Sequence, residues 1–263
     1  MRIMTIAKRV PDSRVTPQIR PDGSGIDTAG LRYVCDPFDE FGIEQAVRLK
    51  ESRTDVQEVC VLSVGGNEVV EILRSAIAMG ADRAVHIFAE ELPAHDELAI
   101  AEVLAAAIRN HPPMPDLVLC GKQNIDNDAG ELGPALAEHL GLPHIGAVTR
   151  LEIDADGSLL RAWRRIEGAE EILESSFPVL LTCDKGLVEP RHPALPKLMK
   201  AKKHPVETIP IAALMDGNLP SAGPVFERLT PPPSRQTCRF IDGEPKEMAR
   251  HLIRLLREEA KVI

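Results

Sequence analysis

The residues from Asp116 to Gly141 place a polar, glycine-bearing loop between a strand and a helix, and this stretch constrains the fold more than any other. Residues 117–120 form an apolar run typical of a buried strand, and residues 132–140 carry an apolar stripe with helical spacing. In an open parallel sheet, nucleotides bind beside such loops because free backbone N–H groups and the positive helix end face an anion there. The loop contains neither GxxxxGK(S/T) nor GxGxxG, so an ordinary strand-to-helix turn stays an alternative.

Short apolar runs alternate with helical stripes through the first half of the chain. Strands are predicted at residues 3–7, 59–64, 84–88 and 117–120, and helices are predicted after residues 36, 67 and 97. Asp36 suits the N-cap of the first helix, with Pro37 at its first position, and Asn67 is expected to cap the second. This alternation favours an α/β fold with a mostly parallel twisted sheet flanked by helices, Rossmann-like and adenine-nucleotide-hydrolase-like.

The hydrophobic period changes after Gly141. Runs at residues 147–153, 159–166, 171–175 and 179–182 alternate or are apolar, with turn signals between them. We expect these runs to form antiparallel strands that extend the sheet, with residues 163–165 on a solvated strand face.

Residues 189–205 form a proline-rich basic block with no acidic residue after Glu189. The spacing of Pro193 and Pro196 is expected to prevent a regular helix through Leu195. An exposed leucine on a rigid basic loop is typical of a docking anchor, whereas composition by itself favours a solvated basic linker.

The residues after 205 lose regular pattern and are punctuated by prolines until a final amphipathic helix at residues 245–260. A long irregular stretch of this kind is unusual inside a compact domain. We therefore divide the chain into a nucleotide-binding α/β domain at residues 1–188, a partner-recognition loop at 189–205 and a C-terminal arm at 206–263. The arm is expected to wrap a partner subunit or to pack back on its own sheet.

Composition excludes several classes of protein. A formal net charge of -9 argues against nucleic acid as a partner. No apolar run approaches the roughly 18 residues of a membrane span, so no membrane insertion is expected. No signal peptide is visible, and the five cysteines fit no zinc or CxxC spacing. We expect a cytoplasmic protein with buried free thiols and no metal site.

Five collinear blocks between Arg2 and about Lys203 resemble the β subunit of electron transfer flavoproteins. They are residues 7–12, residues 37–40 with 44–51, residues 78–83, residues 121–123 with 125–126, and residues 195–196 with 199–203. No single block is specific, but five in the same order are. Beyond Lys203 the likeness is weak.

The resemblance implies a heterodimer with the electron transfer flavoprotein α subunit. The redox FAD lies mainly on the α subunit, and the β subunit encloses one side of it and holds a structural AMP. Such a subunit is an electron carrier and not an enzyme. It docks acyl-CoA-type or related flavin dehydrogenases and passes electrons toward a membrane quinone oxidoreductase. The resemblance makes Leu195 the docking anchor, supported by Pro196, Leu198 and Met199, and places Phe38 near the flavin edge.

The resemblance also implies a nucleotide pocket that includes the loop found above from the strand–helix pattern. The pocket residues are Ile6, Asp36, Pro37, Phe38, Asp39, Val64, Gly121, Lys122, Gln123, Asn124, Ile125, Asp126, Asn127, Asp128, Ala129, Gly130, Glu131 and Leu132. Backbone N–H groups of the loop and helix start would hold the phosphate, and Asp126 or Asp128 would accept from hydroxyls or cap the turn.

Two positions depart from the human-like pattern of the family, which has Thr in place of Leu132 and Asn in place of Asp36. A carboxylate near a phosphate is unfavourable unless it caps a turn or points away. Bifurcating members, which use NADH, bind a second FAD in place of AMP and commonly have Gly at the position of Asn127. Asn127 crowds the space a flavin needs, so AMP is favoured here.

Two other functional classes compete with the electron carrier. A nucleotide-dependent hydrolase or ligase needs a base or nucleophile beside the phosphates, and Lys122 is the only candidate. A stand-alone nucleotide sensor would be stable without a partner, whereas a subunit with a proline-rich arm would not.

Overall fold

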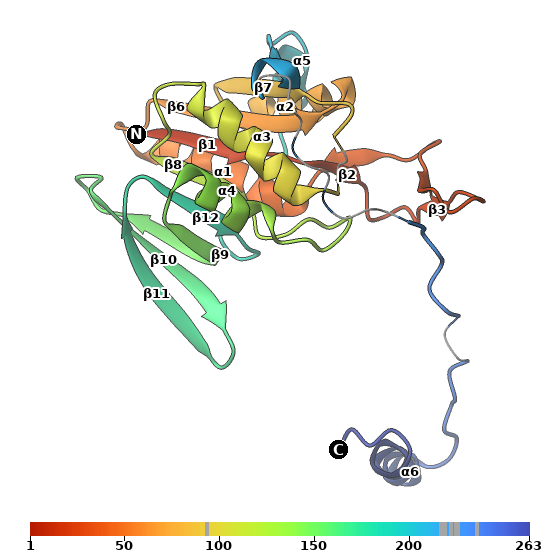
Figure 1. Ribbon diagram of the computed structural model, residues 1–263. Coiled ribbons are helices and arrows are strands. Elements are labelled where there is room, and N and C mark those ends of the chain that lie inside the picture. The colour runs from red at the N-terminus through yellow and green to blue at the C-terminus, as the bar shows by residue number, and fades with distance from the viewer. Residues whose placement is uncertain (93–94, 216–219, 221–222, 224–226, 235–236) are drawn as a thin grey trace.

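A nine-stranded sheet forms the body of the molecule in this computed structural model (Figure 1), which describes residues 1–263 except 93–94, 216–219, 221–222, 224–226 and 235–236. The strands of the sheet are β1 (Arg2–Ile6), β6 (Glu58–Gly65), β7 (Arg83–Phe88), β8 (Leu117–Gly121), β9 (His144–Ile153), β10 (Leu159–Ile166), β11 (Ala169–Ser176), β12 (Val179–Cys183) and β13 (Glu207–Pro210). They lie in the order β11-β10-β9-β12-β8-β1-β6-β7-β13.

Helices cover both faces of this sheet, and one further helix, α6 (Pro245–Glu258), stands away from it. The helices beside the sheet are α1 (Pro37–Ser52), α2 (Val70–Met79), α3 (Glu97–Arg109), α4 (Leu132–Leu140) and α5 (Leu195–Ala201), with short 3-10 helices η1 (Asn67–Val69) and η2 (Ile211–Ala213). Two small antiparallel pairs, β2 (Arg9–Pro11) with β5 (Tyr33–Cys35) and β3 (Gln18–Ile19) with β4 (Ile26–Asp27), project beside the sheet. The predicted α/β class is confirmed.

The order of the strands reverses at β1. Parallel strands β6 and β7 continue the sheet on one side of β1, and β8 pairs with β1 in parallel on the other side. In such a sheet the loops after the two central strands diverge to opposite faces and leave a crevice at their carboxyl ends. The loop at residues 122–131 and the start of α1 both border this crevice.

Side chains alternate between two cores because successive residues of a strand point to opposite faces. Ile3 of β1 packs with Ile43 of α1 and Leu73 of α2 in one core. Ile6 of the same strand packs with Leu104 of α3 and Leu136 of α4 in the other. The sheet is thus buried on both faces, which is typical of parallel strands joined by helical crossovers.

Helix starts in the first half follow the capping pattern in one case and depart from it in another. The Asp36 carboxylate accepts from the Phe38 N–H at 2.9 Å and caps α1, with Pro37 in its first turn. Asn67 does not cap α2. It opens the 3-10 turn η1, and α2 begins only at Val70 because Gly65 and Gly66 let the chain turn tightly into η1 before the α-helix forms.

The expected antiparallel extension is correct for β10 and β11 and wrong for β12. β12 pairs in parallel with β8 and β9, whereas β9–β10 and β10–β11 pair antiparallel. All five residues of β12 are buried, as a two-sided parallel strand requires. Trp163 is also buried and not solvated, because the Arg150 guanidinium lies 4.4 Å above its ring.

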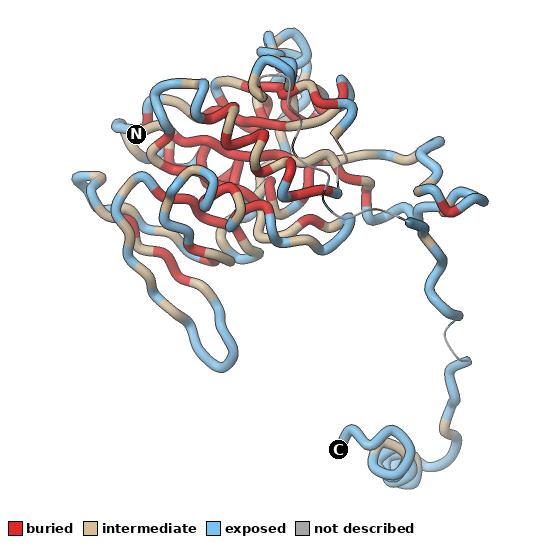
Figure 2. The backbone as a smooth tube through the Cα atoms, in the orientation of Figure 1, coloured by how far each residue is buried: buried red, intermediate tan, exposed pale blue. Residues whose placement is uncertain are grey.

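The basic block and the arm each contain an element that the pattern missed. α5 begins at Leu195 despite Pro196, because a proline in the first helical turn loses no hydrogen bond. β13 pairs in parallel with β7, and Ile209 and Met215 pack against the second core. The helix α6 stands away from the sheet, and none of its residues is buried (Figures 1 and 2).

The expectation of buried free thiols holds for Cys35, Cys60, Cys120 and Cys183, whereas Cys238 is exposed. Within the part of the chain that the structure describes, no helix is both long and apolar enough to cross a membrane.

Candidate functional site

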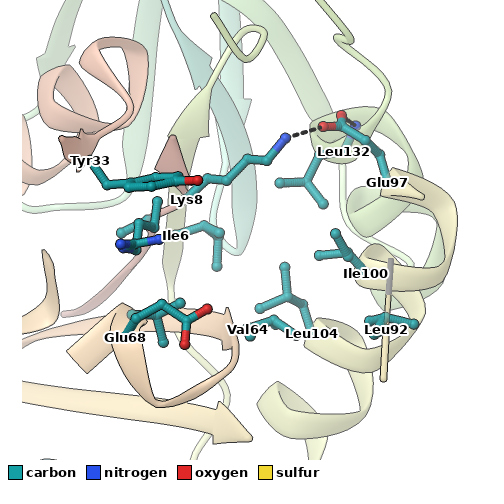
Figure 3. A pocket seen from close by; sticks show the side chains of 14 residues that line it. Ile6, Lys8, Tyr33, Val64, Glu68, Leu92, Glu97, Ile100, Leu104 and Leu132 are labelled. Atoms are coloured by element: carbon teal, nitrogen blue, oxygen red, sulfur yellow. Dashed lines mark hydrogen bonds and ion pairs between the residues drawn. The ribbon is translucent and has the colours of Figure 1, made fainter. Parts of the chain in front are cut away.

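A cavity of about 250 Å³ opens at the carboxyl ends of β1 and β6 (Figure 3). Its size lies near the lower end of ligand pockets, which begin at roughly 300 Å³. Leu132, Ile100 and Leu104 lie on one side, Tyr33 and Glu68 lie on the other, and Lys8 reaches across toward Glu97 beside Leu132. A cavity that combines an aliphatic wall with charged groups suits a ligand that joins a flat ring to an anion.

Lys8 and Arg9 supply the positive charge. The Lys8 Nζ lies 3.0 Å from Asp126 Oδ1 and 3.6 Å from Glu97 Oε1. The Arg9 guanidinium stacks 3.6 Å from the centre of the Tyr33 ring. Both cations follow directly after β1, so the strand itself delivers them to the crevice.

Glu97 ties the start of α3 to the start of α4. Its carboxylate accepts from the Leu132 N–H at 3.2 Å and is almost fully buried. Burial raises the pKa of Glu97, while Lys8 and the Leu132 N–H act in the opposite direction. Glu97 therefore places a carboxylate at the N-terminal end of α4, where the helix dipole favours negative charge.

Two buried carboxylates organise the other side of the crevice. Asp36 accepts from the Ile125 N–H at 2.8 Å as well as from Phe38, and Asp39 accepts from the N–H groups of Lys8 at 2.7 Å and Gly121 at 2.8 Å. Burial and the Asp36 charge raise the pKa of Asp39 to about 8. The first turn of α1 thereby joins the ends of β1 and β8 to the central loop. Asp36 acts as a cap, which meets the condition under which its negative charge is tolerated.

The central loop is held by its own hydrogen bonds. The Asn124 N–H donates to the Ala129 carbonyl at 2.9 Å, the Asp128 N–H donates to the Asn124 carbonyl at 3.0 Å, and the Gln123 side chain donates to Asp128 at 3.1 Å. A Cβ on Gly130 would lie 2.9 Å from the Lys122 carbonyl oxygen. The loop is therefore closely folded before any ligand is considered.

Donors suited to an anion stay unused in this arrangement. Among the described residues, Arg9 Nε and Asn124 Nδ2 are buried without a hydrogen-bond partner. Within the same set, the backbone N–H groups of Gly130 and Glu131, directly before α4, have none either. Buried donors without partners are rare in proteins, so the Arg9 guanidinium fits a bound phosphate in the inner cavity that it lines. Gly130 and Glu131 are exposed, so water can satisfy their N–H groups.

A second hollow of about 600 Å³ adjoins the first on its outer side. Arg9 and Tyr33 line both spaces, and Ile125, Asp126 and Asn127 line only the outer one. A ligand longer than a mononucleotide would have to pass from the inner cavity into this outer hollow.

Phe38 and Lys122 lie together beside the same crevice. The Lys122 Nζ is 5.4 Å from the centre of the Phe38 ring and 3.0 Å from Asp184 Oδ2. Because the Lys122 ammonium group is paired with the Asp184 carboxylate, Lys122 is poorly suited to act as a free base or nucleophile.

The structure divides the expected pocket residues into three groups. Ile6, Val64 and Leu132 line the inner cavity, and Ile125, Asp126 and Asn127 line the outer hollow. The others build the surrounding framework and line neither space: Asp36, Pro37, Phe38, Asp39, Gly121, Lys122, Gln123, Asn124, Asp128, Ala129, Gly130 and Glu131.

Sequence reasoning missed Lys8, Arg9, Tyr33, Glu68 and Glu97 as cavity residues. The signal that could have found Lys8 and Arg9 is their place directly after the first strand, because carboxyl ends of parallel strands meet at one edge. Nothing local indicates Tyr33, which reaches the cavity only because β5 pairs with β2.

The expected docking residues lie on another surface, between α2 and α5. Leu195 is 70% exposed and Met199 is 59% exposed. With Leu198 they line a groove of about 670 Å³ whose opposite wall includes Glu71 and Arg74. Pro196 lies in the first turn of the same helix. The structure thus gathers the apolar residues of the basic block on one exposed helix.

Comparison with known proteins gives one consistent result. A family model described as "Electron transfer flavoprotein domain" matches residues 24–214. The chain is 38% identical over 267 residues to "Electron transfer flavoprotein subunit beta" of Bacillus subtilis, which covers 100% of both chains. It is 38% identical over 213 residues to the Homo sapiens protein of that name, covering 80% of this chain and 81% of the relative. This chain therefore belongs to the electron transfer flavoprotein β-subunit family.

Proposed function

We propose that this chain is the β subunit of a heterodimeric electron transfer flavoprotein that holds AMP in its inner cavity and helps to enclose the FAD of an α subunit. The observation that carries the nucleotide part is the cavity at the strand-order reversal, which combines an aliphatic wall with the unpaired buried Nε of Arg9. FAD supplies the redox chemistry, and this chain binds, orients and docks without making or breaking covalent bonds.

Two features of the cavity support AMP as its ligand. Ile100 and Leu104 would pack against the base, since an adenine ring buries two apolar faces. Lys8 and Arg9, which both line the inner cavity, would meet the phosphate. On binding, Lys8 would exchange part of its pairing with Asp126 and Glu97 for the phosphate.

Two surfaces would serve electron transfer. The end of the crevice that carries Phe38 and Lys122 would face the FAD of the α subunit. The exposed face of α5 would dock acyl-CoA-type or related flavin dehydrogenases, with Leu195 as the anchor. Electrons would then pass toward a membrane quinone oxidoreductase, and the complex would act in the cytoplasm.

A bifurcating electron transfer flavoprotein that uses NADH is the second candidate, and the outer hollow favours it. A second FAD would place its adenosine in the inner cavity and extend past Arg9 and Tyr33 into the outer one. Asn127 lines that outer space, which opposes this arrangement by filling volume that a flavin would use.

The nucleotide content of the αβ complex tests the proposal. Denaturing the purified complex and separating the released nucleotides should give one FAD and one AMP per heterodimer. Two FAD and no AMP would support the bifurcating candidate, and one FAD alone would remove the nucleotide site from this chain.

A matched pair of variants locates the AMP. Lys8→Gln should lower the AMP content while the FAD content stays at one per heterodimer, because the phosphate loses a charge. Lys185→Gln, which changes an exposed lysine, should leave both contents unchanged. Full AMP retention in Lys8→Gln would contradict the assigned phosphate position.

A further inference from the structure

Arg191 joins the chain segment before α5 to helix α1 through two glutamates. Its Nε donates to Glu44 Oε2 at 2.8 Å and its Nη2 donates to Glu44 Oε1 at 3.1 Å. The same guanidinium donates to both oxygens of Glu51 at 2.6 and 2.8 Å. One arginine therefore holds two carboxylates that lie seven residues, or about two turns, apart on one helix.

Glu44 is the buried end of this arrangement. Its side chain is only 1% exposed, and it accepts from Arg48 at 2.6 Å as well as from Arg191. Burial alone would raise the pKa of Glu44, but the hydrogen bonds from Arg191 and Arg48 lower it below its ordinary value. Removing one partner of such a pair leaves a charge buried and unpaired, so the pair enforces its geometry strongly.

Backbone contacts extend the same attachment. The Arg48 Nη2 donates to the Glu189 carbonyl at 2.9 Å, and the Arg191 N–H lies 3.3 Å from Glu44 Oε2. Segment 189–191 is thus fixed in position and direction on α1. Its end lies only four residues before Leu195.

The far end of α5 is fixed by packing. Ala201 is the buried residue of α5, which packs beside α2. Between the two attachments, Leu195 and Met199 are exposed and belong to neither of the two cores that the described residues form. The direction of the exposed face therefore depends on the two ends.

We infer that Arg191 is a positioning residue that sets the orientation in which α5 presents Leu195 and Met199 to a docking dehydrogenase. This inference rests on the proposed docking function of α5. Arg191 lines neither the inner cavity nor the outer hollow, so we expect its loss to alter docking and not nucleotide binding. Losing the clamp would let α5 adopt many orientations, and each encounter would then have to restore the correct one.

Steady-state reduction of the αβ complex by a purified acyl-CoA dehydrogenase tests the inference, with the complex as the varied substrate. Arg191→Met should raise KM about five- to tenfold with kcat unchanged, because docking and not electron transfer is altered. FAD and AMP contents should equal those of the parent complex. Arg191→Lys should be intermediate, because a lysine keeps the charge but not the fork that spans two glutamates.

Arg53→Met is the matched control. Arg53 is an equally embedded arginine that pairs with Asp55 and donates to the Ile153 and Asp154 carbonyls, away from α5. The KM for the Arg53→Met complex should equal the KM for the parent complex, even if the variant has a lower unfolding temperature. If KM rises as much in Arg53→Met as in Arg191→Met, a general loss of stability explains both effects and the inference is overturned.

Leu195→Ala separates this inference from the docking proposal. A raised KM in Leu195→Ala with a parental KM in Arg191→Met would overturn the clamp and leave the docking function standing. A parental KM in Leu195→Ala would remove the docking function itself. If Arg191→Met does not assemble, Glu51→Gln decides, because it removes only the exposed half of the clamp. A KM rise of about twofold is expected there, and an unchanged KM overturns the inference.

Discussion

The strand-order reversal and the exposed face of α5 differ in whether their side chains find a partner within the same chain. At the reversal, Asp36 and Asp39 are buried and each accepts two backbone N–H groups. On α5, Leu195 and Met199 are exposed without apolar cover. The first region pairs its buried carboxylates within the chain, whereas the second leaves apolar side chains exposed to solvent.

The difference indicates that the cavity is already formed before a ligand binds, whereas the apolar side chains of α5 are covered only when another molecule binds. A cavity held by buried carboxylates keeps its shape before its ligand arrives, which lowers the ordering cost of binding. An exposed apolar anchor beside lysines suits a transient interface, since it must release its partner as readily as it binds it.

The largest effect is expected from breaking the buried network at Asp39. Asp39→Ala leaves the N–H groups of Lys8 and Gly121 unpaired and should lower the free energy of unfolding by about 2–4 kcal/mol. Urea denaturation of the purified complex measures this change. Asp154→Ala, which changes a turn carboxylate at the surface, should lie within about 0.5 kcal/mol of the parent. Equal stabilities for both variants would show that Asp39 is not structural.

The pH dependence of the Asp39→Ala effect sharpens the same point. The pKa of Asp39 is raised to about 8 from the model-compound value of 3.8, so between these values the folded state binds the extra proton. The stabilising contribution of that proton is complete below the lower value and is lost as the pH rises through about 8. The destabilisation by Asp39→Ala should therefore be larger near pH 5 than near pH 9. A destabilisation that grows with pH would contradict the raised pKa.

The C-terminal helix extends the comparison to a second uncovered apolar face. Leu252 and Ile253 are about half exposed, and no residue of α6 is buried. Leu255→Asp should weaken association with the α subunit by roughly 2 kcal/mol or more if this face packs on that subunit. Titration of separately tagged subunits measures the affinity, and His251→Ser on an exposed position is the control. Unchanged affinity would leave α6 without a role in assembly.

Leu195→Ala should have a smaller effect confined to docking. Truncating the anchor should slow electron uptake from a dehydrogenase about tenfold at low complex concentration, with FAD and AMP contents intact. Leu98→Ala is the matched control, because Leu98 is a half-exposed leucine on α3. The anchor assignment fails if uptake is unchanged or if both variants slow it equally.

The smallest expected effect concerns the exposed lysines of α5 and the turn that follows it, Lys197, Lys200, Lys202 and Lys203. If the docking partner presents acidic groups, raising the salt concentration should lower the association rate several-fold. Retention of the proposed AMP should change less, because the Lys8 side chain at the inner cavity is only 13% exposed. Stopped-flow reduction at several salt concentrations measures the first quantity, and an association rate that rises with salt would exclude an acidic partner surface.

Much of the fold was determined by the sequence alone. The alternation of short apolar runs with helical stripes identified the parallel sheet, and Asp36 followed by Pro37 located the start of α1. These features succeed because they depend on local hydrogen bonds and on the periodicity of one segment. The central loop was located for the same reason, since a strand and a helix flank it directly.

Only the tertiary structure decided which distant residues share the site. Tyr33 and Glu97 reach the cavity through strand pairing and helix packing, and β13 joins the sheet edge from a segment with no recognisable strand pattern. Pro196 was expected to exclude a helix, yet α5 starts one residue before it, because a proline is compatible with the first turn. The sequence by itself specified the elements and their order, while long-range packing selected their neighbours, since such contacts leave no periodic signal in a single chain.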